Sequence, residues 1–313
     1  MEIIYFIFQN SVTYTVPLLM AALGCLICER SGVTNLCIEG LMLIGCFVSA
    51  VTVMMLQESG TPFTLSVVLG IVAAMAGGIM FSLLYAFAAV NLKADQIISG
   101  IAVNMLAASL TVFMAKVITG SGNIHITRGI IRTDVPLLSE IPVIGPLLFS
   151  NVYWSTYLCF ILWGLMFFLL YRTSFGLRLR GCGEHPSAVA SAGINVRKMR
   201  YLGVMASGLF AGLAGACVLV TYAGDFNAAS GMNGLGFLAI AAMIFGHWNP
   251  LGILGTSFFF GFCMTVSNMG RVFPGLQDIP SAVFGAFPYA ATLIALIFSS
   301  RKSSAPKACG RPF

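Results

Sequence analysis

Glu39 is the residue whose chemistry is hardest to reconcile with its surroundings. It stands in the polar run from Glu29 to Gly40, which separates two long apolar stretches. Measured from Arg30 with a helical rise of 1.5 Å per residue, Glu39 would lie roughly 14 Å deep if those stretches cross a membrane. A carboxylate at that depth must face protein or a watery cavity, be paired, or be protonated. Two interpretations stay open: a broken helix that lines a solute path or gate, and a structural bond to backbone or to Asn104.

Two asparagines extend this polar set. Asn35 lies in the same run, and Asn104 lies inside the fourth apolar stretch. An amide can bond a passing solute or a neighbouring helix, and helix packing is the commoner use. We take Asn35, Glu39 and Asn104 as candidate residues of a substrate path, with helix packing as the alternative.

A second polar island lies further along the chain. Asp225, Asn227 and Asn233 carry groups that bond sugar hydroxyls, and Phe226 offers a ring on which a base can stack. This combination suits a nucleoside. The same residues also suit a loop that lets a re-entrant helix turn, because glycines surround them.

The sequence contains no motif for ATP hydrolysis or metal catalysis. A P-loop needs Gly-Lys-Ser/Thr to hold phosphate, yet none of the five lysines follows a glycine. The histidines His125, His185 and His247 are far apart and form no HExxH pair, and most of the nine cysteines fall inside apolar runs. We therefore expect no bound cofactor, no metal site and no enzymatic activity in this chain.

Long apolar runs surround these residues. Of 313 residues, 58% are hydrophobic and only 8% are charged, whereas a soluble domain of this size would need more ionic side chains at its surface. Hydrocarbon about 30 Å thick needs roughly 20 apolar residues per helical crossing. The sequence predicts an all-α fold, a polytopic transmembrane helical bundle of about nine spans, with eight or ten as alternatives. The predicted spans are 7–28, 36–56, 63–90, 97–118, 152–171, 201–222, 235–247, 251–270 and 281–299.

Two features of these spans carry further predictions. The seventh span is short and rich in glycine, so we expect a re-entrant or broken helix there. Glycines also recur in the third and sixth spans, which run in opposite directions. Paired Gly-rich helices of opposite sense are typical of an inverted repeat. The glycines concerned are Gly70, Gly77 and Gly78, and Gly208, Gly212 and Gly215.

Basic residues between the spans predict the orientation. With the N-terminus outside, twelve Lys and Arg fall on one side, and only Lys116, Arg128, Arg132 and Arg271 fall on the other. Lys and Arg concentrate on the cytoplasmic side of membrane proteins. We therefore predict one transmembrane domain, 1–300, with a cytoplasmic loop at 172–200 and a cytoplasmic tail at 301–313. The net charge of +6 follows from this topology and indicates no nucleic-acid partner.

The 172–200 loop is predicted to hold a short helix from His185 to Ala192. Pro186 suits the first turn of a helix, and Gly193 lies just beyond its end. Such a helix suits docking into a partner protein, and an ordinary solvated loop fits the pattern equally well.

A known signature matches the chain between Glu29 and Gly45. The run ERSGVTNLCIEGLMLIG closely resembles the ERSGVxNxGIEGxMLxGA signature of permeases in nucleoside-type ABC importers, within the branched-chain amino acid and ribose permease superfamily. Cys37 stands where we expect Gly, and both residues are small. The resemblance continues in KADQIISG at 93–100, GCGEHPSAVA at 181–190, GINV at 193–196 and IFGHWNP at 244–250.

The resemblance implies a heteromeric importer in the plasma membrane of a bacterium. A second, homologous permease subunit would complete the pore, and a cytoplasmic ABC ATPase with two nucleotide-binding modules would bind ATP and Mg. An extracellular lipoprotein would deliver the solute. The segment 181–194 resembles the coupling region that docks on the ATPase and transmits its closure, giving alternating access. The residues so implied are Gly183, Glu184, His185, Pro186, Ala188, Ala190 and Gly193.

Three other functions remain as alternatives. The same kind of permease would serve simple sugars, branched-chain amino acids or another small solute. A stand-alone ion-coupled carrier would use Glu39 and Asp225 as its coupling carboxylates. A membrane scaffold without transport would tolerate replacement of its deep polar residues. The GEHPSAVASAGI loop at 183–194 favours the ATP-driven permease.

Overall fold

Seven long apolar helices form the body of the molecule. The computed structural model describes residues 2–136, 139, 145–227, 231–269, 286–288, 290–293, 305–311 and 313. In this part of the chain, seven helices are long and apolar enough to cross a membrane. They are α1 (Glu2–Arg30), α2 (Ile38–Glu58), α3 (Phe63–Ala86), α4 (Gln96–Thr119), α5 (Trp154–Arg172), α8 (Val196–Val218) and α10 (Pro250–Met269). The chain is therefore a multi-pass membrane protein.

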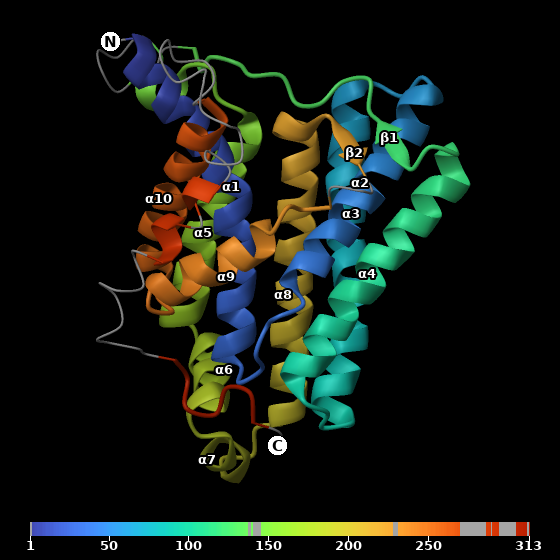
Figure 1. Cartoon of the computed structure of the whole chain (residues 1–313). Helices are drawn as coiled ribbons and strands as arrows, with labels where there is room; N and C mark the ends of the chain where they lie inside the picture. The colour runs from blue at the N-terminus through green and yellow to red at the C-terminus, as the bar shows by residue number, and fades with distance from the viewer. Residues whose placement is uncertain are drawn as a thin grey trace.

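Figure 1 shows these helices side by side as a bundle, with the N-terminus at one end and the C-terminal tail at the other. We call these the outer and inner ends, after the orientation that the basic residues predict. Helices α1 and α8 run through the middle of the bundle and are mostly buried, whereas most of α4 and α5 faces outward. Short π-helical turns extend α3 and α8, at Phe87–Asn91 and Leu219–Ala223, and a third lies at Gly145–Phe149.

The seven helices confirm seven of the nine predicted spans, with ends that differ by a few residues. The two largest differences are at the starts of α1 and α8, which were expected from residues 7 and 201 and begin at Glu2 and Val196. The Asn195 side chain caps α8 by accepting a hydrogen bond from the Lys198 backbone N–H at 3.0 Å. A polar first turn is thus helical although its hydropathy is low. The span expected at 281–299 lies largely outside the described residues, so the count of nine remains a prediction.

Helix α9 (Leu235–Phe245) is too short to cross the membrane. Its 11 residues rise about 16 Å, half the thickness of the hydrocarbon. In Figure 1 it begins near the middle height of the bundle and descends toward the inner end. The seventh predicted span is thus a short helix, and whether it is re-entrant or broken remains a prediction.

The inner end carries two helices between α5 and α8. The shorter one, α7 (Pro186–Ser191), is the helix that the sequence predicted, with Pro186 in its first turn. Gly193 follows it with φ of +79°, a backbone conformation that glycine adopts easily. Helix α6 (Ser174–Glu184) was not predicted, because charged residues and glycines interrupt its apolar positions.

A small β-ribbon lies at the outer end and departs from the predicted all-α fold. Strand β1 (Asn123–His125) pairs antiparallel with β2 (Asp225–Asn227), and Ile124 faces Phe226 in the register. Both central residues are buried while their neighbours are exposed. The ribbon therefore fixes the loop after α4 to the segment that follows α8.

Candidate functional site

A cavity of about 440 Å³ lies between α1, α8, α9 and α10 in the outer half of the bundle. Strand β2 and the turn at 231–234 complete its wall. The volume lies within the range of pockets that hold small organic ligands. Apolar side chains dominate the lining, and a few polar groups converge on it, as in most sites that bind a small molecule.

All four residues of the predicted second polar island line this cavity. They are Asp225, Phe226, Asn227 and Asn233. Phe226 is 1% exposed and packs edge-on against Phe47, with ring centroids 5.5 Å apart. Asn233 holds a left-handed backbone conformation with φ of +52°, which places it in the tight turn before α9. The structure thus brings together the residues that the sequence grouped, and their contact with solute remains a prediction.

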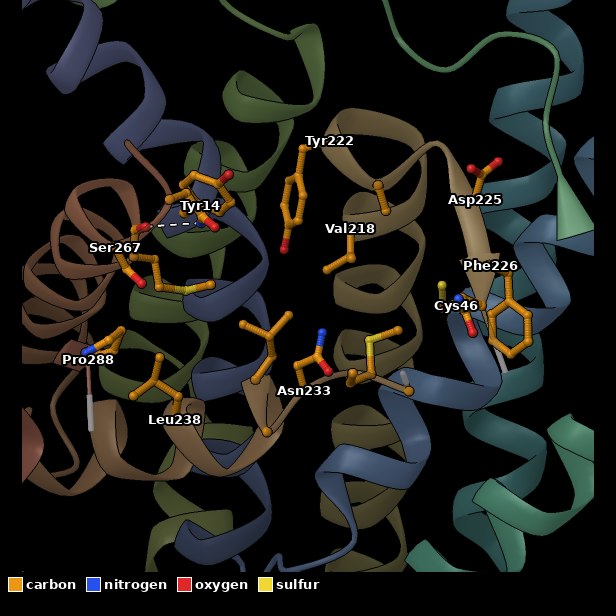
Figure 2. Close-up of a pocket in the computed structure, with 18 residues that line it drawn as sticks. Tyr14, Cys46, Val218, Tyr222, Asp225, Phe226, Asn233, Leu238, Ser267 and Pro288 are labelled. Atoms are coloured by element: carbon orange, nitrogen blue, oxygen red, sulfur yellow. Dashed lines mark hydrogen bonds between the residues drawn. The ribbon is translucent and has the colours of Figure 1, made fainter. Parts of the chain in front are cut away.

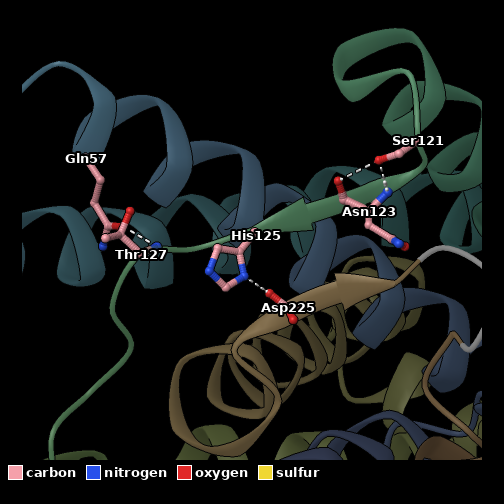
Figure 3. Close-up of polar contacts among 6 residues, drawn as sticks. All are labelled: Gln57, Ser121, Asn123, His125, Thr127 and Asp225. Carbon is pink, nitrogen blue, oxygen red and sulfur yellow. Dashed lines mark hydrogen bonds and ion pairs between the residues drawn. The ribbon is translucent and has the colours of Figure 1, made fainter.

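Asp225 lies at the exposed rim of the cavity. Its carboxylate forms a hydrogen-bonded ion pair with the His125 ring across the β-ribbon, as Figure 3 shows. Nearby, Gln57 of α2 accepts a hydrogen bond from the Thr127 backbone N–H at 2.9 Å and donates one to the Arg128 carbonyl oxygen at 3.0 Å. These hydrogen bonds hold the loop after β1 to α2, and the loop is thus fixed beside the outer rim of the cavity.

Glu39 lies beneath the cavity and contacts backbone. Its two carboxylate oxygens accept hydrogen bonds from the N–H groups of Gly234 and Gly236, at 2.9 and 2.6 Å. Glu39 itself stands in the first turn of α2, and the two glycines stand at the start of α9. Two helix N-termini therefore converge on one carboxylate, an arrangement that stabilises negative charge. The carboxylate fixes the floor of the cavity to α2.

Asn35 and Asn104 bond to neighbouring elements and do not line the cavity. Asn104 accepts a hydrogen bond from the Gly40 N–H at 2.8 Å and donates one to the Leu36 carbonyl oxygen at 2.7 Å. Asn35 is 1% exposed and donates to the Ser207 hydroxyl on α8. Residues 31–37 are not helical, which agrees with the broken helix considered for this run. Together the two amides tie the break to α4 and α8.

The sequence analysis missed four polar residues of the cavity: Tyr14, Tyr222, Ser267 and Asn268. Tyr14 stands alone within an apolar span, Ser267 and Asn268 lie at the end of another, and Tyr222 directly precedes the polar island at 225–233. The rings of Tyr14 and Tyr222 pack together with centroids 4.8 Å apart. The only available signal was the presence of polar side chains within spans, which usually face the interior of a bundle.

The residues implied as coupling residues gather at the inner end, in the turn between α6 and α7 and on α7. None of the residues of α7 is buried, so its surface is open to a partner. Glu184 lies 3.8 Å from Arg30 at the inner end of α1. Gly183 packs so closely on the Arg30 carbonyl oxygen that an added Cβ would overlap it. The docking role of these residues remains a prediction, and the contact of Gly183 and Glu184 with α1 is a finding.

Arg30 also connects the inner end of α1 to the turn between α9 and α10. Its guanidinium donates a hydrogen bond to the Trp248 carbonyl oxygen at 2.8 Å, and the Trp248 indole N–H donates to the Glu29 carboxylate at 2.6 Å. His247 and Trp248 both adopt left-handed conformations, with φ of +54° and +52°. One ion pair and one hydrogen bond thus connect Glu184 through Arg30 to the turn after α9.

The C-terminal tail lies against the same region. The Ala308 N–H donates a hydrogen bond to the Gly183 carbonyl oxygen at 2.8 Å. The buried Arg200 side chain of α8 donates to the Arg311 carbonyl oxygen at 2.9 Å. The described part of the tail therefore contacts both α6 and α8.

Comparison with known proteins gives the family. The family model for the permease component of branched-chain amino acid transport systems matches residues 7–296. The chain belongs to this permease family. The permease is 43% identical to the guanosine ABC transporter permease protein NupQ of Bacillus subtilis, over 100% of this chain and 97% of that protein. It is 39% identical to the nucleoside ABC transporter permease protein NupC of Lactococcus lactis, over 97% and 95% of the two chains.

A solved structure shares the fold of the permease. It is an ABC transporter of metal-chelate type in an inward-facing conformation, with a TM-score of 0.51, 13% sequence identity, and coverage of 93% of this chain and 84% of that one. At this identity the likeness concerns the fold alone. It agrees with the arrangement of apolar helices described above.

Eight of the nine cysteines of the permease are buried. Cys25 and Cys28 stand in a Cys-x-x-Cys spacing, yet both are fully buried in α1. Within the described residues, no group of three or more His, Cys, Asp or Glu side chains is placed to hold a metal ion. Burial raises the pKa of the Cys309 thiol in the tail to about 12, so this thiol stays protonated at neutral pH.

Proposed function

We propose that this permease is the membrane subunit of an ATP-driven importer of nucleosides. The observation that carries the proposal is the 43% identity, over the whole chain, to a permease named for guanosine transport. The second relative, named for nucleosides, supports the same substrate class. Both relatives match across the α9 turn and the cavity as well as across the helices, because the similarity covers nearly all of each chain.

The solute path of this importer runs through the cavity between α1, α8, α9 and α10. Asp225, Asn227 and Asn233 offer donors and acceptors for the hydroxyls of a sugar, and the Phe226 ring belongs to the same wall. Glu39 acts indirectly, because it holds the turn at 231–234 in place through Gly234 and Gly236. Asn35 and Asn104 act in the same indirect way, through the break between α1 and α2.

ATP and Mg bind to a separate cytoplasmic ATPase that docks on α7 and the end of α6. A docking force at Glu184 passes to Arg30 and from there to the α9–α10 turn, because Arg30 forms an ion pair with Glu184 and donates a hydrogen bond to Trp248 in that turn. Helix α9 then moves the cavity floor, which gives alternating access. A second, homologous permease subunit completes the pore, and an extracellular lipoprotein delivers the nucleoside.

We infer that the permease lies in the plasma membrane of a bacterium, as the bacterial sources of the two similar permeases suggest. Twelve of its sixteen Lys and Arg lie on the inner side of the predicted orientation. The domain assignment follows, with a permease domain at 1–300, a cytoplasmic loop at 172–200 and a cytoplasmic tail at 301–313.

The structure disfavours a stand-alone ion-coupled carrier. Such a carrier needs carboxylates that bind and release an ion within the path. Glu39 is held by two backbone N–H groups, and Asp225 is paired with His125 at the exposed rim. Both candidate carboxylates therefore already have partners within the protein.

Uptake measurements test the proposed function. Cells that carry the whole transporter, with and without this chain, are given radiolabelled guanosine, adenosine, ribose and leucine. We expect loss of nucleoside uptake alone when the chain is absent. Loss of ribose or leucine uptake instead would assign the chain to another branch of the family, and no loss at all would refute the transport function.

A further inference from the structure

Tyr222 presents an unusual hydroxyl group to the cavity. The residue lies in the π-helical turn that extends α8, and its hydroxyl oxygen is buried without a hydrogen-bond partner among the described residues. Buried polar groups in native proteins nearly always have partners, and an unpaired one calls for a ligand or another explanation. Figure 2 shows the ring projecting between α1 and α8, with its hydroxyl directed toward the space above Asn233.

The rings of Tyr14 and Tyr222 form an aromatic wall beside this hydroxyl. The Tyr14 ring of α1 contacts the Tyr222 ring at 4.8 Å between centroids, with an angle of 58° between the ring planes. Because the two rings already touch, a third ring would lie on the cavity side of the pair and not between them. The Asn268 side chain of α10 donates a hydrogen bond to the Met264 carbonyl oxygen at 3.0 Å and also lines the cavity.

Polar groups are distributed unevenly around the cavity. Its β2 side carries Asp225 and Asn227, whereas the α1, α8 and α10 side carries the tyrosine pair and Asn268. A nucleoside has the same division, with a hydroxyl-rich sugar at one end and a flat base with polar edges at the other. Aromatic side chains bind bases of any sequence through their π faces.

We propose that the Tyr14–Tyr222 pair holds the base of the nucleoside and that the Tyr222 hydroxyl forms a hydrogen bond with the polar edge of that base. This assignment rests on the proposed function and adds the recognition residues to it. Tyr222 is then a specificity residue of the membrane subunit, independent of selection by the delivering lipoprotein. The sugar lies toward Asp225 and Asn227.

Thiol protection tests this contact without relying on uptake. A Ser267→Cys chain, assembled in the whole transporter, places a reporter thiol in the cavity wall. Eight of the nine native cysteines are buried, and the Cys309 thiol, with its pKa raised to about 12, is a weak nucleophile. The native chain gives the background labelling by a small methanethiosulfonate reagent. Guanosine and ribose are then titrated for protection of the reporter.

Three backgrounds are compared: Ser267→Cys alone, with Tyr222→Phe, and with Tyr201→Phe. The last is a matched control, because Tyr201 is a partly buried tyrosine near the inner end of the same helix. Loss of one neutral hydrogen bond predicts that Tyr222→Phe raises the guanosine concentration needed for half-protection by about threefold to tenfold. Tyr201→Phe should leave it unchanged. Ribose protection should be equal in all three backgrounds.

The outcomes separate this proposal from the proposed function. Unchanged guanosine protection in Tyr222→Phe would overturn the contact while leaving nucleoside import in place. An equal shift for ribose would move the hydroxyl to the sugar and so overturn the base assignment. If no nucleoside uptake depends on this chain, the proposed function and this contact both fail.

Discussion

Glu39 stands deep in a membrane protein without a cationic partner in the part of the chain that the structure describes. Its two side-chain oxygens accept hydrogen bonds from two N–H groups at the start of α9, and it stands itself in the first turn of α2. Helix N-termini carry partial positive charge, so the pair of helices replaces the missing Lys or Arg. Glu39 therefore links α2 to the start of α9, and these two helices carry the cavity floor.

Replacing Glu39 tests this role. Glu39→Ala removes both hydrogen bonds and leaves two buried N–H groups unpaired, at a cost of at least about 2 kcal/mol in the free energy of unfolding. Glu39→Gln keeps one acceptor oxygen and should lose about half of that. The measurement is the thermal midpoint of the purified complex together with nucleoside uptake. Wild-type stability and uptake in Glu39→Ala would show that the bonds do not hold the floor.

At the scale of residues, the sequence indicated the polar residues of one island and missed the polar cavity residues on other elements. The polar island at 225–233 was visible because its polar residues are close in sequence, and all four candidates line the cavity. Tyr14 and Asn268 come from opposite ends of the chain, so only the fold brings them together. The partner of Glu39 was equally hidden, because Gly234 is 195 positions away and contributes only backbone.

Helix α9 is held at both ends, and this explains how a half-length helix is stable in the bundle. Glu39 binds its first turn, and Arg30 binds the carbonyl of Trp248 just beyond its last turn. A short helix alone has little intrinsic stability. Movement of either anchor must therefore move α9, which makes this helix the natural link between the inner end and the cavity.

Charge reversal at Glu184 tests that link. The pair with Arg30 is partly exposed and 3.8 Å long, so it contributes at most about 1 kcal/mol to folding. We expect Glu184→Arg to leave the complex assembled and to lower uptake by about fivefold or more, the size of a typical coupling between sites. Glu58→Arg, at the exposed outer end of α2, is the matched control. Undiminished uptake in a complex of normal composition would count against the coupling role.

A proline in the tail tests its contact with α6. Ala308→Pro removes the N–H that donates to the Gly183 carbonyl oxygen, whereas Ala308→Ser keeps it. Loss of about 1 kcal/mol should make local opening about fivefold more frequent. Hydrogen exchange at the backbone N–H groups of Cys309 and Arg311 should then be faster in the proline variant alone. Equal exchange rates in both variants would mean that the tail is held by other contacts.

Hydropathy located the long helices of this chain well and the short elements poorly. The spans were visible because each needs a long apolar run, whatever its partners. Helix α6 was missed because its stability depends on contact with α1, α5 and α8, which its own sequence does not reveal. The β-ribbon was missed because each strand has three residues and its partner lies about 100 positions away. Helix α7 was predicted because Pro186 and Gly193 mark its ends locally.

The whole bundle depends on close contact between α3 and α8, the two Gly-rich helices that the sequence singled out. They run in opposite directions, and Gly78 of one meets Gly208 of the other. Small residues allow helix backbones to approach, which is the main source of packing energy in lipid. Whether the two helices also descend from an inverted repeat remains a prediction, since their contact follows from glycine alone.

The contact can be tested with one chemical change at two sites. A Cβ at Gly208 would overlap the Gly78 carbonyl oxygen and the Ser82 side chain, whereas a Cβ at Gly164 of α5 would meet no atom within 4 Å. We expect Gly208→Ala to lower the free energy of unfolding by about 2 kcal/mol through overpacking. Gly164→Ala should leave it unchanged or raise it by up to about 1 kcal/mol, because alanine favours a helix. The measurement is thermal unfolding of the purified complex. Equal stability of the two variants would show that α3 and α8 separate readily, and the cavity beside α8 would then lack the fixed wall that solute recognition requires.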